Sequence, residues 1–253
     1  MVSSRQSAII LQNVSKSYHG VQALAPLDVE IPIGARVAIL GPSGSGKTTL
    51  LNLIGGLIRP DEGIVTIEGQ DVTKIKPGRH MAELVGIMHQ QLDLVPHLSV
   101  INNVLAGRLG HWSLLRALWS FLYPQERNLA LAALYRVGIP EKLYGPTSHL
   151  SGGEQQRVAI ARLLVQRPRT ILADEPVASL DPARARNIVS LIAEIVIELD
   201  QTLIVSLHSI DLAREYFTRA IGLREGGIQF DLPVKELRDS TLDDLYDINR
   251  PLE

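Results

Sequence analysis

The chain has 253 residues, with 25 lysines and arginines against 27 aspartates and glutamates, so its formal net charge is −2. Hydrophobic residues make up 45% and charged residues 21%, which is typical of a globular protein and excludes extended disorder. The absence of cysteine excludes disulfides, thiolate catalysis and cysteine-ligated zinc, and the charge argues against a protein that coats nucleic acid. No uninterrupted apolar stretch reaches the roughly 18 residues needed to cross a bilayer, and residues 1–18 do not resemble a signal peptide. We therefore expect a cytoplasmic protein.

The first third of the sequence is predicted to be rich in β-structure. Residues 8–14 and 21–31 mix apolar and polar residues at the short period of strands. The apolar run 36–40 (RVAIL) predicts a buried strand that leads into a glycine-rich loop and then into an apolar helix. A turn signal at 60–63 (PDEG) precedes another alternating strand. We expect an antiparallel part followed by the start of a parallel core.

The rest of the chain is predicted to be helical at first and then to alternate between strands and helices. Residues from about 92 to 164 carry apolar side chains near the helical period. A buried strand at 170–174, a helix at 185–199 and a strand at 202–208 follow. This alternation implies right-handed crossovers and a parallel sheet. The tail after residue 230 is too short for another domain.

The segment 41–48 (GPSGSGKT) fits the pattern G-x-x-x-x-G-K-[ST]. Glycines allow successive backbone N–H groups to surround a phosphate, and the N-terminus of the following helix adds positive partial charge. Lys47 is expected to reach the β- and γ-phosphates of a nucleotide, and the Thr48 hydroxyl to bind Mg²⁺. The candidate nucleotide-binding residues here are Gly41, Pro42, Ser43, Gly44, Ser45, Gly46, Lys47, Thr48 and Thr49.

A second glycine-containing turn lies at residues 151–154 (SGGE). Ser151 and Glu154 have the spacing of a capping box at the start of an apolar helix. A capping box does not need Gly152 and Gly153, because glycine is a weak helix former. Bare N–H groups and a serine hydroxyl at a helix N-terminus suit an anion. We therefore interpret this turn as a helix cap and also as a second phosphate-binding surface.

The segment 150–162 (LSGGEQQRVAIAR) resembles the signature motif of ATP-binding cassette (ABC) ATPases, and the whole chain is similar to one nucleotide-binding domain of that family. The resemblance implies an α/β fold of the P-loop NTPase class and ABC type, with a mixed or parallel core sheet, an antiparallel β subdomain and an inserted helical subdomain. It also implies a head-to-tail homodimer, in which each ATP lies between the P-loop of one subunit and the signature motif of the other.

The same resemblance divides the single domain, residues 1–253, into parts. Residues 1–91 and 165–230 correspond to the RecA-like core together with the antiparallel β subdomain. Residues 92–164 correspond to the helical subdomain, and residues 231–253 form a short C-terminal tail.

Two carboxylates end the predicted strand at 170–174 and resemble the Walker B motif. Ligands of open α/β sheets bind beyond the carboxyl ends of the strands. Asp174 would hold Mg²⁺ through water, and Glu175 would act as general base or polarise the attacking water. The alternative is that both acids simply begin the loop before Pro176.

Four further positions match ABC motifs. Asp181 lies in the D-loop match, His208 matches the switch histidine, and Gln90 matches the Q-loop glutamine, with an offset to Gln91 left open. Tyr18 matches the aromatic residue that stacks on adenine, although a half-buried strand tyrosine is the alternative. The catalytic candidates are Glu175, His208 and Gln90, the Mg²⁺ candidates are Thr48, Gln90 and Asp174, and the remaining nucleotide-binding candidates are Tyr18, Ser151, Gly152, Gly153, Glu154 and Asp181.

The resemblance implies the ATPase subunit of a membrane importer, peripheral on the cytoplasmic face of the inner membrane. Its expected partners are a second copy, two transmembrane permease subunits and a periplasmic or lipid-anchored solute-binding protein. The alternative is a soluble ABC ATPase that acts on ribosomes or DNA, which usually needs two cassettes, a coiled-coil insertion or basic patches. Since this chain has one cassette and no excess positive charge, we expect no nucleic-acid partner.

Several stretches resemble the phosphonate-importer branch, among them 90–110, 173–182 and 207–226. Polar amino acids or another oxyanion remain as alternative substrates. The insert at 111–123 carries apolar residues at helical spacing and both tryptophans of the chain. These side chains either pack the helical subdomain or contribute to a groove that receives a coupling helix of the membrane subunit.

Overall fold

The computed structural model of the protein describes residues 6–122 and 125–246. Among these residues, one antiparallel sheet has the strand order β2-β1-β4-β5, and a larger sheet has the order β10-β9-β3-β8-β7-β6. The strands are β1 (Ser7–Tyr18), β2 (Val21–Pro32), β3 (Arg36–Leu40), β4 (Glu62–Ile67), β5 (Gln70–Asp71), β6 (Val85–Met88), β7 (Thr170–Asp174), β8 (Thr202–Ser206), β9 (Arg219–Arg224) and β10 (Gly227–Pro233).

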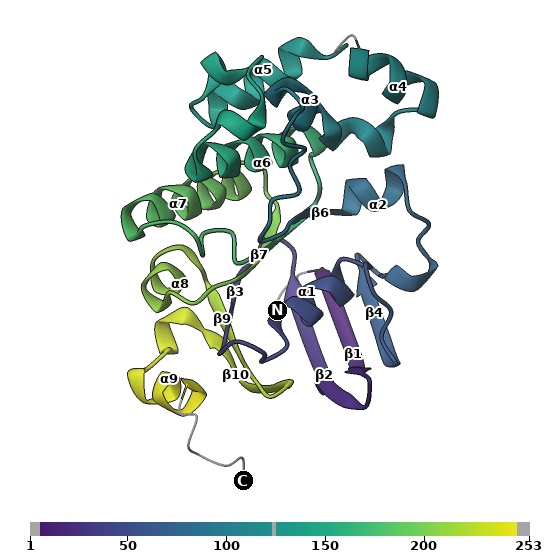
Figure 1. The fold of residues 1–253 in the computed structure, drawn as a ribbon. Helices are drawn as coiled ribbons and strands as arrows, with labels where there is room; N and C mark the ends of the chain where they lie inside the picture. Colours follow the sequence, from purple (N-terminus) through teal and green to yellow (C-terminus); the bar gives the residue numbers. More distant parts are fainter. Residues whose placement is uncertain (1–5, 123–124, 247–253) are drawn as a thin grey trace.

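The helices α3, α4, α5 and α6 gather at one end of the molecule, and β1, β2 and β4 lie toward the other (Figure 1). None of the described helices combines the length and apolar character needed to cross a bilayer. The helices are α1 (Lys47–Ile54), α2 (Arg79–Leu84), α3 (Val100–Leu105), α4 (Leu114–Leu122), α5 (Arg127–Arg136), α6 (Gly152–Gln166), α7 (Pro182–Glu198), α8 (Ile210–Tyr216) and α9 (Asp239–Tyr246).

The larger sheet is parallel except at one edge. Strand β3 pairs in parallel with β8 and β9, and β7 pairs in parallel with β6 and β8, whereas β10 pairs antiparallel with β9. Every residue of β7 and β8 is buried, because elements cover both faces of the sheet. The predicted buried strands, the antiparallel part and the α/β fold class are therefore confirmed.

Some expectations need correction. The helical region does not begin at about residue 92, because Leu92 and Asp93 have φ of +58° and +47° and the first helix starts at Val100. The strand expected over 202–208 ends at Ser206. Strand β6 and the hairpin of β9 and β10 were not predicted, since β6 is short and β10 is a partly exposed edge strand.

Two clusters of buried hydrophobic residues hold the layers together. One joins the antiparallel sheet and α1 to one face of the larger sheet, as at Val14 and Leu50. The other joins the opposite face of that sheet to the helices α3, α5, α6 and α7. Leu242 and Leu245 of α9 belong to this second cluster, so α9 packs against the core. Both clusters surround strands β3, β7 and β8, whose carboxyl ends carry most of the predicted site.

Candidate functional site

The loop between β3 and α1 depends on glycine at two positions. Gly41 has φ of +149° and Gly46 has φ of +102°. A Cβ atom on Gly41 would lie 2.1 Å from the carbonyl oxygen of Leu223, and one on Gly46 would lie 2.7 Å from that of Ala23. Because other backbone segments approach so closely, only glycine fits at these two positions. A compact glycine loop of this kind can direct its backbone N–H groups toward a phosphate.

Lys47 begins α1 and its side chain is 5% exposed. Its Nζ atom donates to the carbonyl oxygens of Gly41 (2.9 Å) and Pro42 (3.0 Å), and it lies 4.0 Å from Oε1 of Glu175. Burial lowers the pKa of Lys47, and the negative charges of Glu175 and Asp174 oppose this shift. The ammonium is thus folded over the loop and held near two carboxylates.

Ser45 supplies a test of whether the loop fits a phosphate. Its hydroxyl oxygen is buried and has no hydrogen-bond partner among the described residues. A buried hydroxyl without a partner is costly, and a phosphate oxygen in the loop would accept its hydrogen bond. Thr48, in the first turn of α1, is exposed and free to turn its hydroxyl to the same side. Both observations fit a nucleotide phosphate with an oxygen-ligated cation.

The ends of β7 and β8 are joined by Ser206. Its hydroxyl donates to Oδ1 of the buried Asp174 (2.6 Å) and accepts from the backbone N–H of Glu175 (2.8 Å). Glu175 has φ of +46°, an uncommon conformation for a residue with a side chain, and this contact helps to hold it. Ser206 was not among the predicted site residues, although a polar residue inside a buried strand was a signal that could have found it.

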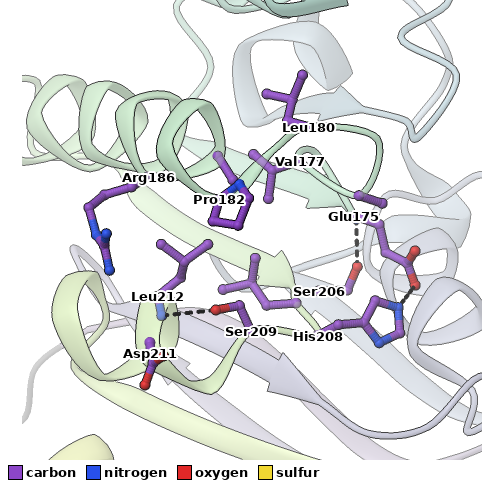
Figure 2. A pocket seen from close by; sticks show the side chains of 13 residues that line it. Glu175, Val177, Leu180, Pro182, Arg186, Ser206, His208, Ser209, Asp211 and Leu212 are labelled. Carbon is purple, nitrogen blue, oxygen red and sulfur yellow. Dashed lines mark hydrogen bonds and ion pairs between the residues drawn. The ribbon is translucent and has the colours of Figure 1, made fainter.

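His208 and Glu175 lie close together although they follow different strands, β8 and β7. Nε2 of His208 lies 2.7 Å from Oε1 of Glu175, and the two side chains point toward each other (Figure 2). The pairing of β7 with β8, with Asp174 opposite Ser206, brings them to the same edge. The structure therefore gathers Lys47, Glu175 and His208 around one carboxylate oxygen.

A cavity of about 310 Å³ borders this pair, between the start of α7 and α8. Figure 2 shows Glu175 and His208 at one end of it and the apolar side chains of Val177, Leu180 and Leu212 along its walls. A space of this size can hold water molecules beside the Glu175 carboxylate. The carboxylate is thus neither sealed in the core nor fully in solvent.

The other predicted residues lie at the rim. Gln90 and Gln91 are both exposed and follow β6, which pairs with β7, so they leave the sheet at the same edge as Asp174. Tyr18 ends β1 and is 43% exposed, with Nζ of Lys16 5.6 Å from its ring centroid. Asp181 accepts a hydrogen bond from the backbone N–H of Arg184 (3.0 Å) and caps α7.

The turn at the start of α6 forms the capping box. The hydroxyl and the backbone N–H of Ser151 both donate to Oε2 of Glu154 at 2.8 Å, and Glu154 N–H donates back to the hydroxyl. Lys142, 2.9 Å from the carboxylate, and the contacts from Ser151 lower the pKa of Glu154 to about 2. A Cβ atom on Gly152 would be 3.9 Å from Leu180, and one on Gly153 would meet nothing within 4 Å. Packing within the chain therefore requires neither glycine.

A sequence profile described as ABC transporter matches residues 24–178, which is more than half of the chain. The chain belongs to the ABC transporter family. The resemblance of the chain to the ABC ATPase family is thereby confirmed.

Curated relatives of this ABC protein include two of nearly its own length. It is 43% identical to "Phosphonates import ATP-binding protein PhnC" of Thiobacillus denitrificans (95% of this chain, 93% of the relative) and 45% identical to the protein of that name from Shouchella clausii (97% and 92%). A relative from Anaeromyxobacter dehalogenans with the same name is 45% identical over 96% of this chain, which spans 49% of that protein.

Solved ABC cassettes have the same fold. The dimeric structure of MJ0796, a bacterial ABC transporter cassette, has a TM-score of 0.79 with 32% identity (90% of this chain, 100% of the other). A dimeric post-hydrolysis state of MJ0796 bound to ADP and Pi has a TM-score of 0.78 with 32% identity and the same coverage. The chain is thus an ABC ATPase cassette that binds nucleotide.

Proposed function

We propose that the chain is the ATPase subunit of an ABC importer that takes up phosphonates or a related phosphorus oxyanion. The observation that carries the ATPase activity is the meeting of Lys47, Glu175 and His208 at the edge of the larger sheet. Beside them lies the glycine loop, whose buried Ser45 hydroxyl has no partner among the described residues. The support for the substrate is the name of two relatives, phosphonates import ATP-binding proteins that match 95% and 97% of the chain at 43% and 45% identity.

Hydrolysis transfers the γ-phosphoryl group of ATP to water, for which the protein supplies positioning and charge. The loop amides and the Lys47 ammonium hold the β- and γ-phosphates, and Lys47 exchanges its two loop carbonyls for phosphate oxygens. Glu175 accepts the proton of the attacking water, which reaches it from the adjoining cavity. His208 keeps the Glu175 carboxylate in place and faces the γ-phosphate.

The residues present fit a magnesium ion. Asp174, Thr48 and Gln90 offer a carboxylate, a hydroxyl and an amide oxygen, which are the hard donors that Mg²⁺ prefers. When bound, Mg²⁺ neutralises charge on the phosphates. Ser206 holds Asp174 by a 2.6 Å hydrogen bond, so the carboxylate is oriented before any ion arrives.

The active unit in this proposal is a head-to-tail homodimer. Ser151, Gly152 and Gly153 face the γ-phosphate of the partner's ATP, and Asp181 lies in the segment that crosses to the partner. The open space around both glycines supports this, because no packing among the described residues requires a glycine at either position. Tyr18 stacks on the adenine, for which its 43% exposure leaves room.

The chain works at the cytoplasmic face of the inner membrane with two permease subunits and a periplasmic or lipid-anchored solute-binding protein. Residues 92–164 act as the helical subdomain, which moves relative to the core of residues 1–91 and 165–230 through the Gln90 segment. Residues 231–253 form the tail. None of these parts needs to touch the transported solute.

Growth on defined phosphorus sources tests the substrate. A strain without this gene, and without a redundant importer, should fail on a phosphonate or phosphite as sole phosphorus source and grow normally on phosphate. The wild-type gene should restore growth and the Glu175→Gln gene should not. Normal growth of the deletion strain on all these compounds would reject the substrate, with polar amino acids and other oxyanions as the next solutes to test.

A further inference from the structure

Helix α4 (Leu114–Leu122) turns its apolar side outward. Leu115, Leu118 and Trp119 are 80%, 61% and 58% exposed, whereas Ser120 is 3% exposed and Ala117 is half-buried. Residues three and four apart lie on one face of a helix, so the exposed three form one stripe and the serine and alanine form the opposite one. A surface helix normally buries the apolar side, so this arrangement indicates that another apolar medium covers α4.

Because α4 lies at the margin of the molecule, its exposed apolar stripe protrudes from the surface. Figure 1 shows α4 at the margin of the helical end, away from both sheets. Long side chains that stand out from such a helix need a partner that adapts around them. A layer of lipid headgroups and the upper acyl chains does so, and tryptophan favours that depth.

The charge around the stripe is positive, unlike that of the whole chain. Residues 100–140 contain four arginines and one glutamate, while the chain as a whole carries a net charge of −2. One of the four, Arg136, pairs with Glu198 of α7, which leaves Arg108, Arg116 and Arg127 with Glu126. Glu126 is shared by Arg108 (3.2 Å) and Arg116 (2.7 Å). Nε of Arg127 donates to the hydroxyl of Tyr144.

One further acidic group lies close by. Oε1 of Glu83 is 3.8 Å from Nδ1 of His111, but the same oxygen accepts a 2.7 Å hydrogen bond from Arg79. Glu83 and Glu126 are therefore both already paired with arginine. The surface that remains is complementary to an anionic one.

We propose that α4 docks on the membrane itself, with Leu115, Leu118 and Trp119 in the headgroup layer of an anionic phospholipid surface and the neighbouring arginines at the level of the phosphates. The contact adds a lipid anchor to the protein contacts with a permease. It does not depend on which solute is transported, and it is measured on the chain without permease.

Vesicle binding tests the proposal. The full chain should float with vesicles of phosphatidylcholine and phosphatidylglycerol at low ionic strength, and much less with phosphatidylcholine alone. The double variant Leu115→Ser/Leu118→Ser should partition at least about tenfold less, since two apolar side chains no longer enter the bilayer. A matched control, Ile197→Ser/Leu199→Ser, changes two exposed apolar residues near the end of α7 and should bind like the parent.

Fluorescence gives a second readout at the site. The chain has two tryptophans, so Trp112→Phe leaves Trp119 as the reporter, and its emission should shift to shorter wavelength with anionic vesicles. The proposal is wrong if the parent chain does not bind anionic vesicles, if the α4 double variant binds like the parent, or if the control loses binding equally. Docking that needs permease and ignores lipid charge would identify a protein partner instead and overturn it as well.

Discussion

Oε1 of Glu175 lies 2.7 Å from Nε2 of His208 and 4.0 Å from Nζ of Lys47. Glu175 and His208 follow the ends of β7 and β8, and Lys47 begins α1 after the loop that follows β3. In the sheet order, β8 lies between β3 and β7. One carboxylate oxygen thus lies beside both His208 and the lysine of the glycine loop. A phosphate that draws Lys47 away changes the surroundings of Glu175 directly.

Replacing Glu175 with glutamine should separate binding from hydrolysis. The amide keeps the shape of the side chain and a contact with His208 but accepts no proton, so turnover in the assembled complex should fall by roughly 10²–10⁴-fold. Nucleotide binding should stay close to that of the parent. Asp211→Asn, at the other end of the same cavity, is the control and should hydrolyse ATP normally. Parental turnover of Glu175→Gln would remove Glu175 from the mechanism.

Lys47→Ala should weaken ATP binding itself. The variant loses a charge-assisted contact with the phosphates and leaves the carbonyls of Gly41 and Pro42 without their present donor. Titration of the chain with a fluorescent ATP analogue measures the loss. Lys74→Ala removes a lysine whose side chain is 81% exposed and should not change the affinity. Equal affinities for both variants would contradict the role of Lys47.

Ser206→Ala should affect stability and turnover together. The change removes the donor to Asp174 and the acceptor for Glu175 N–H, and an unpaired buried carboxylate oxygen costs about 1–3 kcal/mol. Denaturant unfolding measures that cost. Turnover should fall more than ATP affinity, because the hydroxyl positions the two acids and is not expected to touch the nucleotide. A variant with parental turnover would show that the β7 backbone alone positions Glu175.

The capping box of α6 should make stability depend on acid pH. The pKa of Glu154 is lowered from 4.5 to about 2 by Lys142 and Ser151. A depressed pKa contributes stability that is present above about pH 4.5 and is lost as the pH falls toward 2. Glu154→Gln should therefore be less stable than the parent by about 1 kcal/mol at pH 7, and the difference should shrink toward pH 3.

Lys142→Met removes the main cause of that shift and should reproduce part of the loss at pH 7. Denaturant unfolding at pH 7, 5 and 3 measures both variants. A deficit of Glu154→Gln that stays the same at all three values would mean that the carboxylate charge does not stabilise the cap.

The sequence was sufficient for features set by local pattern. The runs at 36–40 and 170–174 are strands at those residues, because continuous apolar runs bounded by loops read as buried strands. The capping box at Ser151 and Glu154 also forms as its spacing predicts. In each case the residues that determine the structure are neighbours in the chain.

Features that depend on pairing between distant segments could not be predicted from local sequence patterns. Ser206 holds Asp174 only because β8 pairs with β7 in one register, and no local pattern gives that register. Gly41 is required because the carbonyl of Leu223, in the unpredicted strand β9, lies against it. The packing of Leu245 into the core likewise depends on a helix at the end of the chain that apolar periodicity did not reveal.

The proposed composite site can be tested by adding a charge at Gly152. A side chain there meets only Leu180, at 3.9 Å, so Gly152→Asp should not disturb the fold. In a dimer it would put a carboxylate against the partner's γ-phosphate. Like charges about 4 Å apart cost on the order of 4 kcal/mol at an effective dielectric of 20, roughly a thousandfold in an equilibrium constant.

The experiment uses the Glu175→Gln background, in which ATP should persist and hold the dimer closed. Adding Gly152→Asp should leave ATP binding to the monomer near normal and prevent closure, measured by size-exclusion chromatography or by crosslinking in the full complex. Gly152→Asn has the same size without the charge and should close to a much greater extent. If the Asp variant closes on ATP as readily as its parent, Ser151, Gly152 and Gly153 act only as a helix cap, and the phosphate of the partner lies elsewhere.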